Sequence, residues 1–204
     1  MCVSLGVLMR NRSRAACLAA VLVGALSLQA RAQEPVGDAG TASSPPEVTV
    51  RHDMFVSLKT VRDFFPTITR TNAEEGSTGP GKPEATRTVA YTTADRGQRV
   101  ALTVAEYDTA GDALSGYQEA LSKSQSSELN PIAISNVGQQ VFANTITQGG
   151  ATSVVMTSLD GSLIVGATMA GYEASTDNIS KLAGLVRAEV TQAHKHIGTR
   201  RRRG

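Results

Sequence analysis

Two short clusters of acidic and aromatic residues are the part of this chain best suited to proton transfer. Glu106-Tyr107-Asp108 and Tyr172-Glu173 each follow a run with the alternation of a β-strand. Paired carboxylates beside a tyrosine can serve as general acid and base, or bind a cation. The same positions equally suit tyrosines that pack at strand ends and acids that stabilise a following helix. These five residues are therefore the ligand-binding candidates, and no residue is assigned a catalytic role.

Two further patterns suggest functions that their neighbouring residues contradict. Residues 76–82 fit the phosphate-loop pattern G-x-x-x-x-G-K, but Pro83 stands where a hydroxyl would hold Mg²⁺, and no apolar strand precedes the loop. His194 and His196 lie two residues apart on a predicted helix, where side chains point to different sides, so they do not form a metal pair. We expect no metal site, no cofactor and no enzymatic activity.

Residues 9–32 have the pattern of a secretory signal peptide. Arginines at positions 10, 12 and 14 precede an uncharged apolar run over residues 15–28, and the Ala-Arg-Ala of residues 30–32 is typical of a signal peptidase site. The run is shorter than the roughly 20 apolar residues that a membrane-spanning helix needs. We expect cleavage after Ala32 and a periplasmic or secreted protein.

Cysteine usage and charge narrow the function further. Cys2 and Cys17 both precede position 33, so the processed chain has no disulfide, no thiol nucleophile and no cysteine-ligated zinc. Of the 20 basic residues, four also precede position 33, whereas all 18 acidic residues follow it, which leaves a net charge of −2. This balance argues against a nucleic-acid partner.

The C-terminus is the one strongly basic segment of the chain. Arg200, Arg201, Arg202 and Arg203 are consecutive and could contact an anionic membrane surface at about 1 kcal/mol per charge. The alternative is a disordered end that only adds solubility.

The positions of these residues depend on a predicted single domain. Residues 33–47 are rich in Pro, Gly, Ala and Ser and predict a flexible linker, followed by one α+β domain over 48–198 and a basic tail over 199–204. Helical spacing predicts helices over 58–65, 111–125 and 175–195, and residues 67–84 are predicted to form a loop. Period-two alternation predicts strands over 86–94, 99–107, 139–147, 152–158 and 163–170.

The order of these elements predicts the fold. Strands that follow one another through turns such as Asp160-Gly161, without β-α-β alternation, favour an antiparallel sheet. We expect a two-layer α+β domain with a sheet of about five strands and two amphipathic helices packed on one face. A shift of 65 residues aligns 88–121 with 153–186 and pairs Tyr107 with Tyr172. This indicates either an internal β-β-α duplication or two unrelated segments of similar composition.

In layout, residues 99–121 and 163–190, each a strand followed by a helix, resemble the small exported domains of the PsbP type. That resemblance implies a helix-backed antiparallel sheet acting as a binding or assembly module, and it implies no site residues. The leading hypothesis is an exported, non-enzymatic binding or accessory protein of the bacterial cell envelope. Its contact surface would be the exposed sheet face or the loop over 67–85, with a protein or envelope component as partner. The alternative is an envelope hydrolase or metal-dependent enzyme that uses Glu106, Asp108 and Glu173.

Overall fold

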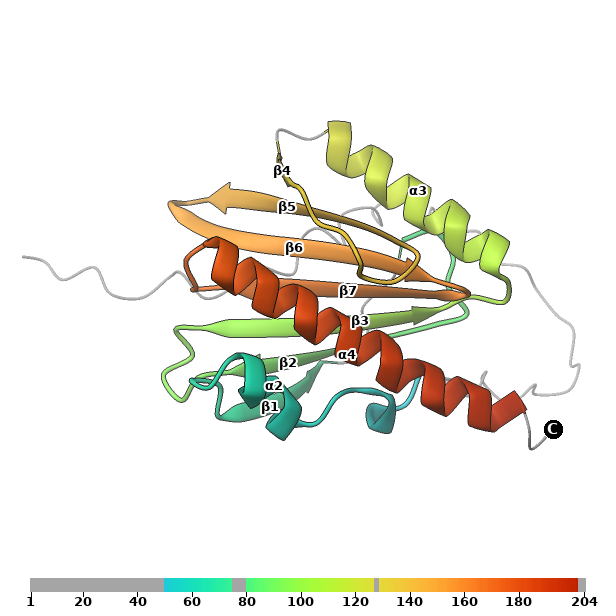
Figure 1. The fold of residues 1–204 in the computed structure, drawn as a ribbon, viewed down its shortest axis with the longest axis horizontal. Helices are drawn as coiled ribbons and strands as arrows, with labels where there is room; N and C mark the ends of the chain where they lie inside the picture. Colours follow the sequence, from blue (N-terminus) through green and yellow to red (C-terminus); the bar gives the residue numbers. More distant parts are fainter. Residues whose placement is uncertain (1–49, 75–79, 127–128, 202–204) are drawn as a thin grey trace, which may run out of the picture.

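A computed structural model describes residues 50–74, 80–126 and 129–201, and shows an antiparallel sheet with helices on both faces (Figure 1). The sheet has seven strands in the order β1-β2-β3-β7-β6-β5-β4, and every neighbouring pair is antiparallel. The strands are β1 (Arg70–Glu74), β2 (Ala85–Thr92), β3 (Arg99–Glu106), β4 (Asn130–Ile132), β5 (Gln140–Gln148), β6 (Ala151–Asp160) and β7 (Leu163–Ala170). The helices are the short η1 (His52–Met54), α2 (Leu58–Phe64), α3 (Ala110–Ser126) and α4 (Thr176–Arg201).

The predicted α+β class and antiparallel sheet are confirmed, but the sheet has two more strands than expected. Both additional strands lie at the sheet edges. β1 falls inside the predicted loop 67–84; its polar residues show no alternation, and it forms because its backbone pairs with β2. β4 contains Pro131, which cannot donate a ladder hydrogen bond and is tolerated because the strand is at an edge.

The helices also differ from the expected arrangement on one face. α4 and α2 lie over one face, where α4 runs obliquely across the strands (Figure 1). α3 packs on the opposite face: its Ala113 and Tyr117 contact Ala105, Leu159 and Ile164. Amphipathic spacing shows that a helix has an apolar side, but it does not say which sheet face that side covers.

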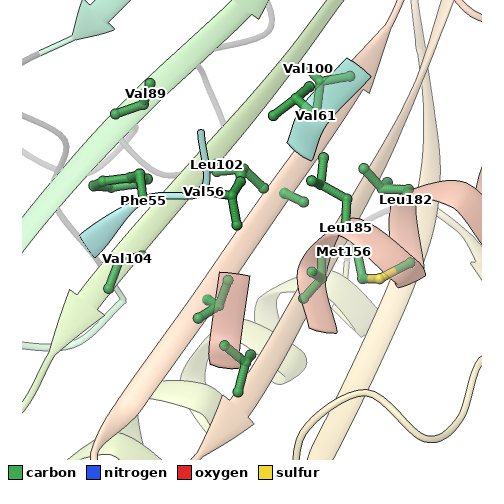
Figure 2. Packing of buried hydrophobic residues seen from close by; sticks show 14 of the residues in the cluster. Phe55, Val56, Val61, Val89, Val100, Leu102, Val104, Met156, Leu182 and Leu185 are labelled. Atoms are coloured by element: carbon green, nitrogen blue, oxygen red, sulfur yellow. The ribbon is translucent and has the colours of Figure 1, made fainter. Parts of the chain in front are cut away.

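The main core lies between the sheet and α4, and it is aliphatic. Alternate residues of β3, Val100, Leu102 and Val104, point into it and are fully buried. Residues 50–57, which we call the N-terminal segment, enter this core beside α4. Figure 2 shows Phe55 and Val56 among side chains of β2, β3 and α4.

Local capping residues explain where the two long helices begin. The Thr109 hydroxyl accepts a hydrogen bond from the amide of Asp112 at 3.1 Å, at the start of α3. The Ser175 hydroxyl accepts one from the amide of Asn178 at 3.3 Å, at the start of α4. Side-chain oxygens at this position satisfy amides that have no partner inside the helix.

The strands of the two suspected repeats are laid out symmetrically, but the two units are not equivalent. β3 and β7 pair at the centre of the sheet, with β2 and β6 outside them. However, Ala90 pairs with Ala101, whereas Val155, 65 residues further on, pairs with Thr168 and not with Gly166. The helices that follow, α3 and α4, also lie on opposite faces.

A pair of glycine substitutions tests this packing. Gly171 and Gly150 both have positive φ, +76° and +81°, so alanine at either position costs about 1 kcal/mol in backbone strain. At Gly171 a Cβ would also lie 2.0 Å from the carbonyl oxygen of Gly97, whereas at Gly150 it would meet nothing within 4 Å. We expect Gly171→Ala to lower the free energy of unfolding in urea by about 2 kcal/mol more than Gly150→Ala. Equal losses would contradict the contact between β7 and the β2–β3 loop.

Candidate functional site

The structure places the predicted acidic and aromatic candidates at two opposite ends of the sheet. Glu106, the last residue of β3, pairs with Leu163, the first residue of β7. Tyr172 and Glu173 follow the other end of β7, where Ala170 pairs with Arg99. Because β3 and β7 are antiparallel, the clusters are separated by the length of the strand pair, roughly 24 Å. Glu106 and Asp108 therefore do not share a pocket with Glu173.

At the first end, Tyr107 is buried and its hydroxyl is used to hold the chain. The hydroxyl donates a hydrogen bond to the carbonyl oxygen of Pro80. Gly116 of α3 permits this approach, because a Cβ there would lie 2.9 Å from the Tyr107 hydroxyl and 2.8 Å from the Pro80 oxygen. Burial raises the pKa of Tyr107, and the negative charge of Glu119 acts in the same direction. Tyr107 is thus a neutral structural donor at physiological pH.

The acids beside Tyr107 make no joint site. Asp108 is exposed at the turn into α3. Glu106 is half-buried, and within the described residues its Oε2 has no hydrogen-bond partner.

At the second end, Tyr172 joins two loops. Its ring packs on Phe65 with centroids 5.1 Å apart, and its hydroxyl lies 3.0 Å from the Thr67 hydroxyl. Thr67 donates its own proton to Gln98 Oε1 at 2.8 Å, so Tyr172 is the donor to Thr67. Burial raises the pKa of Tyr172. Glu173 is exposed, and its backbone carbonyl accepts a hydrogen bond from the Asn178 side chain at 3.0 Å.

The two C-terminal histidines contact different partners. His194 Nε2 lies 3.0 Å from Oδ2 of Asp160, the last residue of β6. His196 Nδ1 lies 3.9 Å from Asp53 Oδ2 in η1. Within the part of the chain that the structure describes, no group of three or more metal-ligating side chains occurs. Of the arginine tail, Arg200 and Arg201 end the backbone of α4, and Arg202 and Arg203 lie outside the described residues.

One buried acid was missed by the sequence analysis. Glu189 is 0 % exposed, on the face of α4 that also carries Leu185 and Ala193 one turn before and after it. Its Oε2 accepts a hydrogen bond from the amide of Val56 at 2.9 Å, and the hydroxyl of Tyr91 donates to the Val56 carbonyl at 2.7 Å. We call these three residues the Val56 clasp. The available signal was the spacing of Glu189, three residues after Val186 within the apolar stripe.

Burial determines the protonation states of the two side chains in the clasp. It raises the pKa of Glu189 to about 8, although the hydrogen bond from Val56 acts in the opposite direction. Burial also raises the pKa of Tyr91, as does the charge that Glu189 would carry. Both side chains are therefore mainly neutral at pH 7. The clasp can hold a proton in the core, but it opens onto no described surface, because both side chains are almost fully buried.

The central strands also present a half-exposed surface on the α3 side of the sheet. α3 covers the end of this face at Ala105, Leu159 and Ile164 and continues along β5, where Asn144 donates a hydrogen bond to Ser124 at 2.6 Å. Beyond it lies a continuous patch that we call the open strip; it consists of Thr103, Val155, Thr157, Gly166 and Thr168. All five are small or β-branched, and none is charged. Thr103 is fixed by a 2.8 Å hydrogen bond between its hydroxyl and that of Thr88. The strip can therefore offer hydroxyl groups and a flat contact surface.

No described helix has the length and apolar character required to cross a membrane. No protein-family model matches the chain, and no curated protein matches it. Among solved structures, the chain is similar to the extracellular domain of PknH from Mycobacterium tuberculosis. The similarity covers 68% of this chain and 93% of that chain, with 11% sequence identity and a TM-score of 0.46. At this level the similarity carries no information about function.

The raised pKa of Glu189 predicts how stability depends on pH. The unfolded chain releases this proton near the ordinary pKa of 4.5, whereas the folded chain keeps it to about pH 8. Its contribution is therefore fully present below pH 4.5 and is lost as pH rises to 8, at no more than about 1.4 kcal/mol per pH unit. We expect the free energy of urea unfolding of the wild-type chain to fall over this range relative to Glu189→Gln. Glu173→Gln, which changes an exposed acid, should follow the wild-type curve; parallel curves for all three chains would disprove the assignment.

Proposed function

We propose that the protein is an exported, non-enzymatic binding or accessory protein of the bacterial cell envelope, and that the open strip is its contact surface. The observation that carries this proposal is the composition of the strip. A solvent-facing sheet surface commonly carries charged or strongly polar side chains in alternation with the core. Here five adjacent half-exposed positions at the centre of the sheet are threonines, a valine and a glycine. Such a surface can pack closely against a partner while its hydroxyls supply hydrogen bonds.

The edges of the sheet are less suited to binding a partner strand. β4 has three residues, and one of them is Pro131, which lacks the amide needed to pair with an added strand. β1 has five residues, and its described side chains, Arg70, Thr71 and Asn72, are polar and exposed. Short edges of this kind disfavour strand addition. The face of the sheet is thus the better contact surface, and it is the alternative that we favour over the loop at 67–85.

The enzymatic alternative has no support in this geometry, since its three carboxylates lie at two ends of the sheet. The basic tail remains a prediction about contact with anionic membranes. The layout resemblance to PsbP-type domains supports a binding role only by analogy.

Export is tested by the size and location of the processed chain. We expect expression with the native N-terminus to give a periplasmic or secreted product that begins at Gln33, because cleavage follows Ala32. Intact-mass measurement of the periplasmic and medium fractions checks this. Replacing the apolar run with a charged one should leave the full-length chain in the cytoplasm. A wild-type product that stays cytoplasmic with an intact N-terminus would exclude export.

Binding is tested by placing a long charged side chain in the open strip. Thr168→Arg and Val155→Arg should each prevent the close approach of a partner and reduce its recovery in pull-downs from envelope extract by tenfold or more. Ser180→Arg adds the same side chain at an exposed position of α4, on the other side of the sheet, and should keep wild-type recovery. Circular dichroism confirms that each variant is folded. Equal recovery with all three variants would exclude the strip as the contact surface.

A further inference from the structure

The core between α4 and the sheet contains one carboxyl group that has no counter-charge. Glu189 is 0 % exposed, and no ion pair to it occurs within the described residues. Oε2 accepts one hydrogen bond, from Val56, while Oε1 has no hydrogen-bond partner in the described chain. An ionised carboxylate in such surroundings is strongly disfavoured, because the side chain has no exposed surface and no described cation lies against it.

The group that Glu189 holds is the backbone of the N-terminal segment. Phe55 and Ser57, on either side of Val56, each make a backbone hydrogen bond to the adjoining helix, whereas the buried peptide groups of Val56 are satisfied by side chains. The Val56 amide donates a hydrogen bond to Glu189, and the Val56 carbonyl accepts one from Tyr91. These partners are 133 and 35 residues away in sequence. The attachment of residues 50–57 to the core therefore depends on both α4 and β2.

The other charged groups near the clasp lie at its outer rim. On the N-terminal segment, Arg51, His52 and Asp53 are exposed, and Arg51 pairs with Asp53 at 3.3 Å. On α4, Gln192 donates to the Asp53 carbonyl at 3.2 Å, and His196 lies 3.9 Å from the Asp53 carboxylate. β2 contributes Tyr91, whose pKa burial raises further above the pH range of interest. Glu189 is thus the one interior group of the clasp whose charge changes near neutral pH.

We propose that the Val56 clasp is a pH-sensitive fastening, in which neutral Glu189 keeps residues 50–57 docked and ionised Glu189 releases them while the rest of the fold stays intact. Ionisation requires water at the carboxyl group. The covering segment is irregular and held at Val56 by two side chains, whereas α4 has its own helical hydrogen bonds and a large apolar face. Displacing the segment exposes the buried side chains of Val50, Met54, Phe55 and Val56, but displacing α4 would expose a longer apolar face. The segment is therefore the less costly of the two to displace. Burial raises the pKa of Glu189 to about 8, so release becomes progressively more favourable as pH rises towards 8 and does not increase further above it.

Limited proteolysis of the full chain measures this release. Trypsin can cut after Arg51 and Lys59, which flank the clasp, once the segment leaves the core. The cleavage rate at these two sites is compared between wild type and Glu189→Gln at each pH from 6.5 to 9, so that the pH dependence of trypsin cancels. Gln keeps the shape and can accept the Val56 hydrogen bond, but it cannot ionise. His196 is present in both chains, so its contribution cancels as well.

We expect the wild-type to Glu189→Gln rate ratio to rise at least fivefold between pH 6.5 and pH 8 and to level off above pH 8. Tyr91→Phe should speed cleavage at both sites at every pH, because it removes the second hydrogen bond to Val56. Tyr107→Phe is the matched control: it removes the hydroxyl of another buried tyrosine, bound to Pro80, and should leave these two rates unchanged. A ratio that does not change with pH would overturn the proposal. Equal acceleration after Lys123 and Arg187 would also overturn it, since the whole domain would then be opening.

Hydrogen exchange of the wild-type chain gives an independent measure if Glu189→Gln does not fold. The exchange rate of residues 50–57 is divided by that of α3 residues at the same pH, which removes the hydroxide catalysis common to all amides. A quotient that rises several-fold between pH 6.5 and 9 supports local release. A constant quotient contradicts it.

Discussion

The pairing of β3 with β7 is the constraint on which the rest of the fold depends. It joins two hairpins at the centre of the sheet and fixes which residues of each strand face which helix layer. With Leu102 opposite Ala167, one set of alternate residues faces α4, and the intervening set faces α3 and the open strip. A shift of one residue would exchange the two sets and expose the core. This single register therefore determines that one face of the sheet forms the main core and the other carries α3 and the open strip.

Elements with a strong local sequence signal were predicted correctly, whereas strands that form only by pairing with a neighbouring strand were not. α4 was predicted because its apolar spacing is long and regular and Ser175 caps it. The β6–β7 turn was predicted because Asp160-Gly161 is a strong local signal. β1 was missed because Arg70, Thr71 and Asn72 carry no apolar pattern; a neighbouring backbone determines that strand, and sequence patterns contain little information about such pairing. β4 was missed because Pro131 predicts a break in the chain and not a strand.

The candidate site shows a related limit. Asp108 and Glu173 are 65 residues apart, so they occupy equivalent positions in the alignment of the two segments, just after β3 and β7. Once those strands pair antiparallel, equivalent ends point in opposite directions. Glu189 was overlooked for a different reason: an acid within an apolar stripe is usually assigned to the helix surface, and only the N-terminal segment, far away in sequence, makes its position an interior one. The separation of the acids and the burial of Glu189 both depend on long-range geometry that spacing along the chain does not encode.

The clasp also has a consequence for how the chain folds. Val56 lies near the beginning of the domain, but it is held by a residue of the last helix, 133 positions later. The core between the sheet and α4 cannot close until α4 exists, whatever the hairpins do earlier. Contacts of such wide separation slow folding, because a long loop must be ordered before they form. The core around Val56 therefore stays incomplete until α4 has been synthesised, however early the hairpins form.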